Sequence, residues 1–267
     1  MEYKLLDTGG EQKLEQFGGI TLVRPCAQAV WRPSLSPAAW EKANAVFTRE
    51  PTSRWIGKVP PSWTTSHAGI TFKLAPTDFG HVGMFPEHSL LWSWMQDCLS
   101  PGAQLLNLFA YTGGATFAAA RQGAAVCHVD ASKAAVAWAR ENSQLNGLEK
   151  APIRWIVDDV LQFLKREVRR GRLYTGIILD PPTFGRGSRG EVFKIEKDLP
   201  EILRLAFSLL VKGPAFLILS SHTPGYTPLV LKHLLSQEVS HGTIEAGELV
   251  VPGPLPLPAG TYARWFS

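Results

Sequence analysis

The sequence predicts an α/β fold. Its main part would be a doubly wound, mostly parallel seven-stranded sheet with an antiparallel C-terminal strand pair, and a small β-rich N-terminal domain would precede it. Short apolar runs alternate with helical patterns between residues 105 and 237, as in parallel strands joined by helices. The last two strand-like segments, "TIEAGELVV" and "TYARWFS", have no helix between them, which indicates an antiparallel pair. The first 86 residues hold short strand-like pieces with frequent Pro and Trp. We therefore predict domains at residues 1–86 and 87–267.

The composition is that of a folded protein with a sizeable core. The chain has 267 residues, of which 45% are hydrophobic and 19% charged. A net charge of +4 suits a polyanionic partner without requiring one. Cys26, Cys98 and Cys127 are too widely spaced for a disulfide framework or a metal-binding pair, so no metal is expected. With no leader-like segment and no apolar run near about 18 residues, we expect a cytoplasmic protein.

The N-terminal domain reads as three strand-like pieces and one helix. The strand-like pieces are "EYKLLD", "GGITLVRP" and "GITFKLAP". The segment "SPAAWEKANAVF" is expected to be helical, with Ser36 as N-cap and Pro37 at the first helical position. A further helix with a broad apolar face is expected at residues 88–99.

The second domain alternates strands and helices in a regular order. The expected strands are "LLNLFA", "AAVCHVD", "IRWIV", "YTGIILD" and "AFLILSS". The helices that follow them are expected in "GGATFAAARQG", "SKAAVAWARENSQL", "DVLQFLKREVRR", "KDLPEILRLAFSLL" and "PLVLKHLLSQ". In such a sheet ligands bind at the carboxyl ends of the strands, so the residues that follow each strand are the first candidates for a site.

Acids and glycines follow these strands. Gly113 and Gly114 open a helix where the backbone can approach a ligand, although a tight turn alone would also use them. Asp130 ends the second strand, where an acid can accept both hydroxyls of a ribose or serve the next helix. Asp158 and Asp159 open the third helix, where caps also favour acids. A nicotinamide dehydrogenase is disfavoured, because "AYTGGA" is not G-x-G-x-x-G and "DPP" has no role there.

These segments resemble a known family. "NLFAYTGGAT", "VDASKAAVAWARENSQLNG", "DDVLQFL" and "DPPTF", preceded by "FGHVGMFPE", are similar to the motifs of Rossmann-like (class I) S-adenosylmethionine-dependent methyltransferases. More narrowly they resemble the bacterial 23S rRNA large-subunit methyltransferases. The resemblance covers about half of the chain and implies S-adenosylmethionine as cofactor and RNA, in particular rRNA, as partner.

The resemblance also implies roles for individual residues. The loop after the first strand would wrap the methionine half of the cofactor with Asn107, Phe109, Ala110, Tyr111, Thr112 and Gly113. Asp130, with Ala131 and Ser132, would bind the ribose. Asp159, flanked by Asp158 and Val160, would accept from the adenine amino group. The cofactor would be covered from the other side by Phe85, Pro86 and Glu87.

The fourth strand ends on the segment expected to be catalytic. Pro181 and Pro182 fix the turn that holds Asp180 beside the reactive methyl group, where its carboxylate can orient the acceptor. Phe184 could stack on a base. The basic residues of the following loop could bind RNA phosphate: they are Arg186, Arg189, Lys194 and Lys197. The basic run at 165–172 is more typical of a solvated helix end.

The sequence departs in two ways from the pattern of the family that it resembles, and these departures bear on the acceptor atom and on the substrate. Neither "DPPT" nor "LSSH" contains the cysteine that carbon methylation of cytosine needs, so a nitrogen acceptor is favoured. No separate RNA-binding domain can be matched in the N-terminal stretch. The alternatives left open are a 5-methylcytosine RNA methyltransferase, a protein or small-molecule methyltransferase, and a non-catalytic cofactor-binding module. His81 and His222 are assigned no role.

Overall fold

A computed structural model describes residues 2–49, 51–186 and 192–267 of the chain. The chain forms two compact units. The first comprises Met1–Ser89 together with Val250–Ala259, and the second comprises Leu90–Leu249 together with Gly260–Ser267. The predicted domain limits at 1–86 and 87–267 stay a prediction.

The first unit is built from β-strands. A five-stranded sheet has the order β1-β2-β3-β4-β5, in which only β3 and β4 run parallel, and β6 and β7 form a separate hairpin. Phe17, Phe47 and Phe72 are among its largest fully buried side chains. The elements, in chain order, are β1 (Tyr3–Gly9), β2 (Gln12–Phe17), β3 (Ile20–Pro25), α1 (Pro37–Trp40), β4 (Ala45–Thr48), β5 (Arg54–Gly57), β6 (Trp63–His67), β7 (Ile70–Leu74) and the 3₁₀ turn η1 (Pro86–His88).

The expected helix over residues 36–47 is wrong for most of its length. The structure has four helical residues in α1, and the Ser36 side chain makes no capping hydrogen bond. The segment then becomes strand β4, which pairs with β3 on one side and β5 on the other. Ala45 and Phe47 alternate into the core of this unit, so burial and strand pairing override the local helical preference of an alanine-rich segment.

The second unit contains a seven-stranded sheet with the order β10-β9-β8-β11-β14-β16-β15. Strands β8, β9, β10, β11 and β14 are parallel, and β16 is antiparallel to β14. The predicted fold class is therefore confirmed. The elements are α2 (Ser89–Cys98), β8 (Gln104–Leu108), α3 (Gly114–Ala120), β9 (Ala125–Asp130), α4 (Lys133–Leu145), β10 (Ile153–Val157), α5 (Val160–Arg169), β11 (Gly176–Leu179), β12 (Phe184–Arg186), β13 (Val192–Lys194), α6 (Ile195–Ser208), β14 (Phe216–Ser221), α7 (Pro228–Ser236), β15 (Thr243–Val251) and β16 (Leu257–Phe266).

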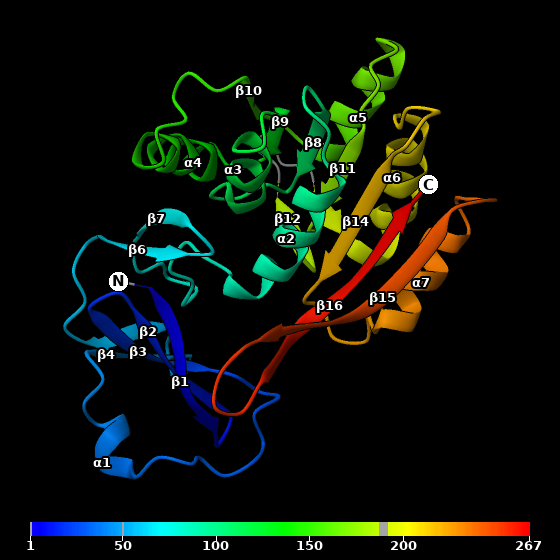
Figure 1. The fold of residues 1–267 in the computed structure, drawn as a ribbon. Helices are drawn as coiled ribbons and strands as arrows, with labels where there is room; N and C mark the ends of the chain where they lie inside the picture. Colours follow the sequence, from blue (N-terminus) through cyan, green and yellow to red (C-terminus); the bar gives the residue numbers. More distant parts are fainter. Residues whose placement is uncertain (1, 50, 187–191) are drawn as a thin grey trace. The chain divides into compact units, whose positions relative to one another are not determined.

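Helices cover both faces of this sheet. Helices α3 and α4 lie on one face, and α5, α6 and α7 lie on the other (Figure 1). Residues of these strands point alternately to the two faces of the sheet. Leu106 and Leu108 belong to the buried cluster under α5–α7, whereas Asn107 and His128 contact Thr116 of α3 on the other face. Strands buried on both faces are continuous in apolar residues, which is why the sequence revealed them.

The strand order reverses between β8 and β11. From β8 the chain proceeds outward through β9 and β10, then returns to add β11 and β14 on the other side of β8. The connections that leave β8 and β11 diverge at this point and open a crevice at the carboxyl ends of the strands. Among the described residues, no helix is both long and apolar enough to cross a membrane.

Candidate active site

A cavity of about 160 Å³ lies at the carboxyl ends of the parallel strands. It collects side chains from the ends of β8, β9, β10 and β11 and from the short strands β12 and β13. The lining residues are Phe109, Asp130, Ala131, Ser132, Asp159, Val160, Pro182, Gly185 and Phe193. The structure thus brings together predicted ribose, adenine and catalytic segments, and it adds Gly185 and Phe193.

The loop after β8 has an unusual backbone. Phe109 and Tyr111 have φ angles of 54° and 47°, and Gly113 has 97°, so the loop repeatedly enters the left-handed region. A Cβ on Gly113 would lie 2.6 Å from the ring of Phe117, and one on Gly114 would lie 2.4 Å from the ring of Trp92. The two glycines therefore allow the loop to pack closely against the rings of Phe117 in α3 and Trp92 in α2.

Asp130 holds this loop in place. Its Oδ2 accepts a hydrogen bond from the Tyr111 N–H at 2.8 Å, and its Oδ1 accepts one from the Ser132 N–H at 2.8 Å. Burial raises the pKa of this carboxyl, and the two N–H donors oppose the rise. Each carboxylate oxygen has a second acceptor site, so the group can still receive hydroxyl donors from a ribose.

Asn107 belongs to a buried hydrogen-bond network. Its side chain is buried, and its Nδ2 donates to Thr116 Oγ1 at 3.0 Å, which in turn lies 2.9 Å from His128 Nδ1. The predicted contact of Asn107 with the cofactor stays a prediction, but its side chain already belongs to a buried network beneath the loop. Ala110 and Thr112 are also buried in this loop, and the Thr112 carbonyl accepts from Asn142 Nδ2 at 3.0 Å.

The two acids after β10 have different surroundings. Asp159 caps α5 by accepting from the Gln162 N–H at 2.9 Å, and it also lines the cavity. Asp158 forms an ion pair with Arg166 and is absent from the cavity wall. Of the two acids, Asp159 is thus the one that lines the cavity, while the partner of Asp158 lies on α5.

Asp180 follows β11 directly and is held by the neighbouring strand. Its Oδ1 accepts from Ser220 Oγ at 2.7 Å, and His222 Nδ1 lies 3.5 Å from the same oxygen. The next turn is tied to the same strand end, because the hydroxyls of Thr183 and Thr223 lie 2.8 Å apart. The carboxylate is therefore anchored by groups that leave it about a quarter exposed.

The proline turn and its neighbours point in different directions. Pro181 is buried, whereas Pro182 is exposed and lines the cavity. Phe184 is 51% exposed, so its ring is available to a partner.

The segment expected to be a basic loop instead forms a hairpin, in which β12 pairs with β13. Strands of three residues leave almost no periodicity, so the sequence holds little signal for them.

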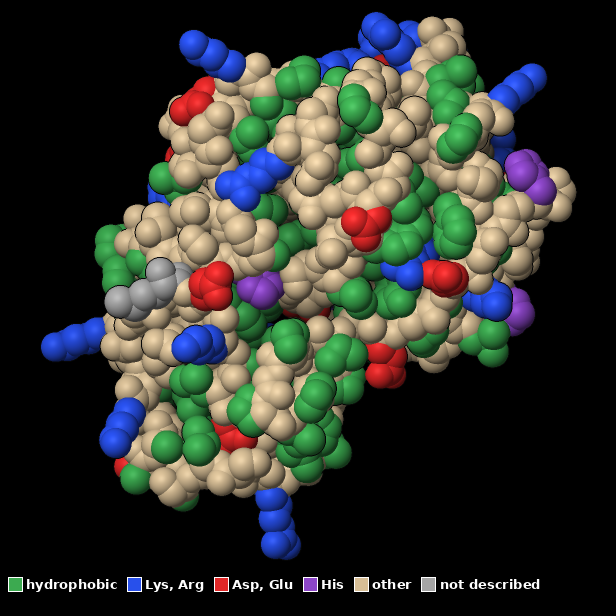
Figure 2. All heavy atoms as spheres, in the orientation of Figure 1, with side chains coloured by type: hydrophobic (Ala, Val, Ile, Leu, Met, Phe, Trp, Pro, Cys, Tyr) green, Lys and Arg blue, Asp and Glu red, His purple; other side chains and the backbone are tan. Residues whose placement is uncertain are grey.

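The predicted phosphate-binding residues are spread over this hairpin and the helix after it. Lys194 is exposed, and its backbone N–H donates to Asp198 Oδ2 at 2.7 Å at the start of α6. Lys197 is exposed in the first turn of α6. Arg186 ends β12, and Arg189 lies outside the described residues. Figure 2 shows Lys and Arg side chains scattered over the face in view, so charge alone singles out no surface there.

Phe85, Pro86 and Glu87 belong to the first unit. Phe85 packs edge-on against His81, with ring centroids 5.2 Å apart, and Glu87 is buried. The Pro86 carbonyl accepts from Ser89 Oγ at 2.8 Å. The expectation that these three residues cover the cofactor stays a prediction.

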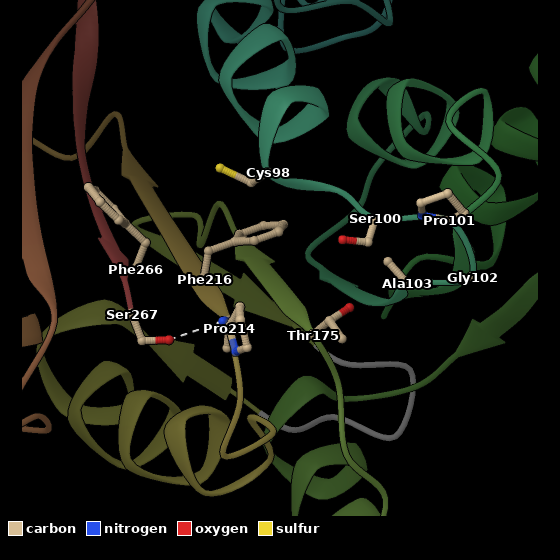
Figure 3. Close-up of a pocket in the computed structure, with 11 residues that line it drawn as sticks. Cys98, Ser100, Pro101, Gly102, Ala103, Thr175, Pro214, Phe216, Phe266 and Ser267 are labelled. Carbon is tan, nitrogen blue, oxygen red and sulfur yellow. Dashed lines mark hydrogen bonds between the residues drawn. The ribbon is translucent and has the colours of Figure 1, made fainter.

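Two cysteines lie at the opposite edge of the sheet. Cys98 lines a cavity of about 350 Å³ beside Thr175, Phe216 and Ser267, at the amino ends of β8, β11 and β14 (Figure 3). Cys127 lines another of about 530 Å³ at the amino end of β9. Burial raises the pKa of the Cys98 thiol and raises that of Cys127 to about 11. Neither thiol is at the edge that carries Asp180, and neither is disposed to ionise.

Comparison with curated proteins finds relatives that are much longer than this chain. The Ribosomal RNA large subunit methyltransferase K/L of Syntrophotalea carbinolica is 40% identical over 139 residues, which are 51% of this chain and 19% of that protein. The protein of the same name from Shewanella pealeana is 37% identical over 151 residues, 56% of this chain and 21% of that protein. The chain spans about a fifth of the length of these curated relatives.

Solved structures and a family model match far more of the chain. A SAM-dependent methyltransferase from Agrobacterium tumefaciens is 38% identical, has a TM-score of 0.94, and is matched over 99% of this chain and 90% of that one. SMU.776, a methyltransferase solved with SAH, shares the fold at 21% identity and a TM-score of 0.76, over 96% of this chain and 72% of that one.

The family model described as S-adenosylmethionine-dependent methyltransferase matches residues 42–244. This match confirms the resemblance read from the motifs and contradicts the dehydrogenase alternative, whose glycine pattern the loop lacks. It identifies S-adenosylmethionine as the cofactor. Asp130, Phe109 of the left-handed loop and Pro182 of the proline turn line one cavity, and this arrangement fits that cofactor. The chain belongs to the family of S-adenosylmethionine-dependent methyltransferases.

Proposed function

We propose that this methyltransferase transfers the methyl group to a nitrogen atom of a base in RNA, with ribosomal RNA as the first candidate. The observation that carries the proposal is the anchored Asp180 carboxylate directly after β11, followed four residues later in the chain by the exposed aromatic ring of Phe184. The names of the curated relatives support the RNA class. Since the match covers only about a fifth of the length of those proteins, their full activity is not transferred to this chain.

The cavity suggests how the cofactor would be held. Asp130 would accept from the ribose hydroxyls, with Ala131 and Ser132 beside it, and Asp159 would accept from the adenine amino group. The loop from Phe109 to Gly113 would enclose the methionine half. When bound, S-adenosylmethionine supplies an electrophilic methyl group on a positively charged sulfur.

Asp180 would act on the acceptor. A nitrogen lone pair must meet the methyl carbon in line with the breaking carbon–sulfur bond, so orientation of the acceptor accounts for much of the rate. The carboxylate can accept a hydrogen bond from an N–H of the base and hold its proton once the new bond forms. Ser220 fixes the rotamer of Asp180 through its Oδ1, and Pro181 and Pro182 stiffen the turn that carries it.

The state of the thiols supports a nitrogen acceptor. Carbon methylation of cytosine requires a thiolate that attacks the base. Burial raises the pKa of Cys26, Cys98 and Cys127, and none of them follows β11 or β14 in the sequence. A nitrogen acceptor needs no such adduct, because it attacks with its own lone pair.

A base acceptor is favoured over a small molecule by the exposed ring of Phe184. Flat bases stack on aromatic side chains with about 1–3 kcal/mol per base, and a target base drawn from a loop can reach such a ring. Exposed Lys194 and Lys197 lie close by in the chain and could meet phosphates. We also propose that the protein is cytoplasmic, as the sequence analysis expects.

The test is a labelled-methyl assay on extracts of a strain that lacks the protein. Total RNA, total protein and the small-molecule fraction are incubated separately with the purified chain and labelled S-adenosylmethionine. We expect label in RNA only, released as an N-methylated nucleoside on digestion. Label confined to protein or small molecules would reject the RNA assignment, and no transfer to any fraction would favour a cofactor-binding module.

Two variants sharpen this test. Asp180→Ala should lower turnover by about 10²-fold while SAH affinity stays within a few-fold, because the group acts on the acceptor. The triple variant C26S/C98S/C127S should keep most of its activity if it is folded. Loss of activity in a folded single-cysteine variant, together with a covalent complex on 5-fluorocytosine RNA, would instead indicate carbon methylation.

A further inference from the structure

The β12–β13 hairpin presents two different faces. Its register pairs Phe184 with Lys194 and Gly185 with Phe193. Because side chains alternate along a strand, Gly185 and Phe193 share one face, and Phe184 and Lys194 share the other. The exposures agree with this division: Phe193 is half-buried, whereas Phe184 and Val192 are each 51% exposed.

The inner face of the hairpin closes the cavity at the strand ends. Phe193 and Gly185 line it together with Asp130 and Asp159, the two acids assigned to the ribose and the adenine. The ring of Phe193 lies 5.2 Å from that of Phe109, at an interplanar angle of 54°. These two rings give the cavity an aromatic wall, while the acids supply its polar groups. An aromatic wall with polar acceptors at its rim is suited to a flat heterocycle that carries an amino group.

The base of the hairpin is held firmly in this position. The Ile195 N–H donates to the Thr183 carbonyl at 3.2 Å, and the Lys194 N–H donates to Asp198 at 2.7 Å. Phe193 also packs against the buried cluster under α5–α7. Its ring therefore belongs to the site and is not a side chain that merely falls near it.

We propose that Phe193 is a cofactor-binding residue that packs on the adenine ring of S-adenosylmethionine. This inference rests on the proposed placement of the adenosine half against Asp130 and Asp159. It assigns a cofactor role to a segment that the sequence indicated only for contact with RNA. Gly185 lies between the turn and the ring, since a Cβ there would be in van der Waals contact with Pro182 at 3.6 Å and with Phe193 at 3.9 Å.

The test measures binding of SAH and of adenosine by isothermal titration to the full chain. Phe193→Ala should lower the affinity for SAH and for adenosine about 10-fold, since a base–aromatic contact accounts for a factor of that order. Phe193→Tyr should retain near wild-type affinity because it keeps the ring. Val192→Ala is the matched control, on the same strand and the opposite face, and should leave both affinities unchanged.

Parallel variants separate failure of this inference from failure of the proposed site. If Asp130→Ala weakens binding but Phe193→Ala behaves like Val192→Ala, the inference is wrong and the placement of the cofactor stands. If Asp130→Ala also leaves both affinities unchanged, the placement itself is wrong and the inference falls with it. Should Phe193→Ala fail to fold, Phe193→Leu keeps apolar volume without the ring, and wild-type affinity in that variant would overturn the inference.

Discussion

The buried imidazole of His128 should make the stability of the second unit depend on acid. The side chain is fully buried in the centre of the sheet, with Nδ1 next to Thr116. Within the described part of the chain its Nε2 has no hydrogen-bond partner. Burial lowers the pKa of this group from 6.5 to about 3, and the backbone carbonyl of Tyr111 opposes the shift only in part. The native state therefore keeps His128 neutral under conditions that protonate it in the unfolded chain.

The size of the effect follows from the two pKa values. Between about pH 6.5 and 3 the unfolded chain binds one more proton than the native state at this residue, so stability falls as the pH is lowered. Each unit of pKa difference corresponds to about 1.36 kcal/mol, which gives on the order of 5 kcal/mol over the full window. From pH 6.5 to 4.5 the loss from His128 alone should be about 2–3 kcal/mol.

The assay compares urea unfolding of the wild type and His128→Gln at pH values from 7 to 4.5. The amide of Gln keeps a polar group near Thr116 but does not titrate, and every other ionisable group is common to both proteins. The free energy of unfolding of the wild type should fall more steeply, approaching an extra slope of about 1.36 kcal/mol per pH unit. If the free energies of unfolding of the two proteins fell with pH at the same slope, the reasoning would be refuted, because His128 would then take up its proton in the native state. SAH binding at pH 7 serves as the check on folding.

Two further predictions concern the site and the sheet. SAH affinity should fall as the pH is lowered through the raised pKa of Asp130, since a protonated carboxyl accepts poorly from ribose hydroxyls. In titration calorimetry, Asp130→Asn should bind SAH more weakly than the wild type, and its affinity should depend less on pH. Identical pH profiles of the two proteins would contradict the assignment of Asp130 to the ribose. Gly176→Ala should cost about 1–3 kcal/mol in urea unfolding, because its Cβ would lie 2.2 Å from the ring of Phe216. Gly213→Ala, where a Cβ meets nothing within 4 Å, is the control, and equal losses would argue against a steric cause.

The sequence was most informative where burial leaves a simple pattern. Strands covered on both faces need unbroken apolar runs, and "LLNLFA", "AAVCHVD" and "AFLILSS" were recognised on that basis. The glycines at 113 and 114 also stood out in the sequence: Gly113 has a left-handed backbone, and a Cβ on either residue would lie within 3 Å of an aromatic ring.

Local patterns failed where tertiary contacts decide the outcome. Residues 45–48 form a strand because two neighbouring strands pair with them, which no property of "AVFT" alone reveals. The buried hydrogen bond of Asn107 to Thr116 likewise depends on a residue nine positions later in the chain, so the sequence alone did not indicate it, while its predicted contact with the cofactor stays a prediction. Phe193 was missed because strands of three residues leave almost no periodicity to detect.

On the two proposals above, the β12–β13 hairpin would contact the cofactor with one face and the acceptor with the other. If Phe193 packs on the adenine while Phe184 and Lys194 meet the base and its phosphate, the same pair of strands contacts both reactants. A ligand that binds one face and stabilises the hairpin in its position also favours binding on the other face, and by linkage the effect must be equal in both directions. S-adenosylmethionine would then strengthen RNA binding as much as RNA strengthens cofactor binding. Such coupling would favour formation of the complete complex, in which Asp180 has both an acceptor to orient and a methyl group within reach.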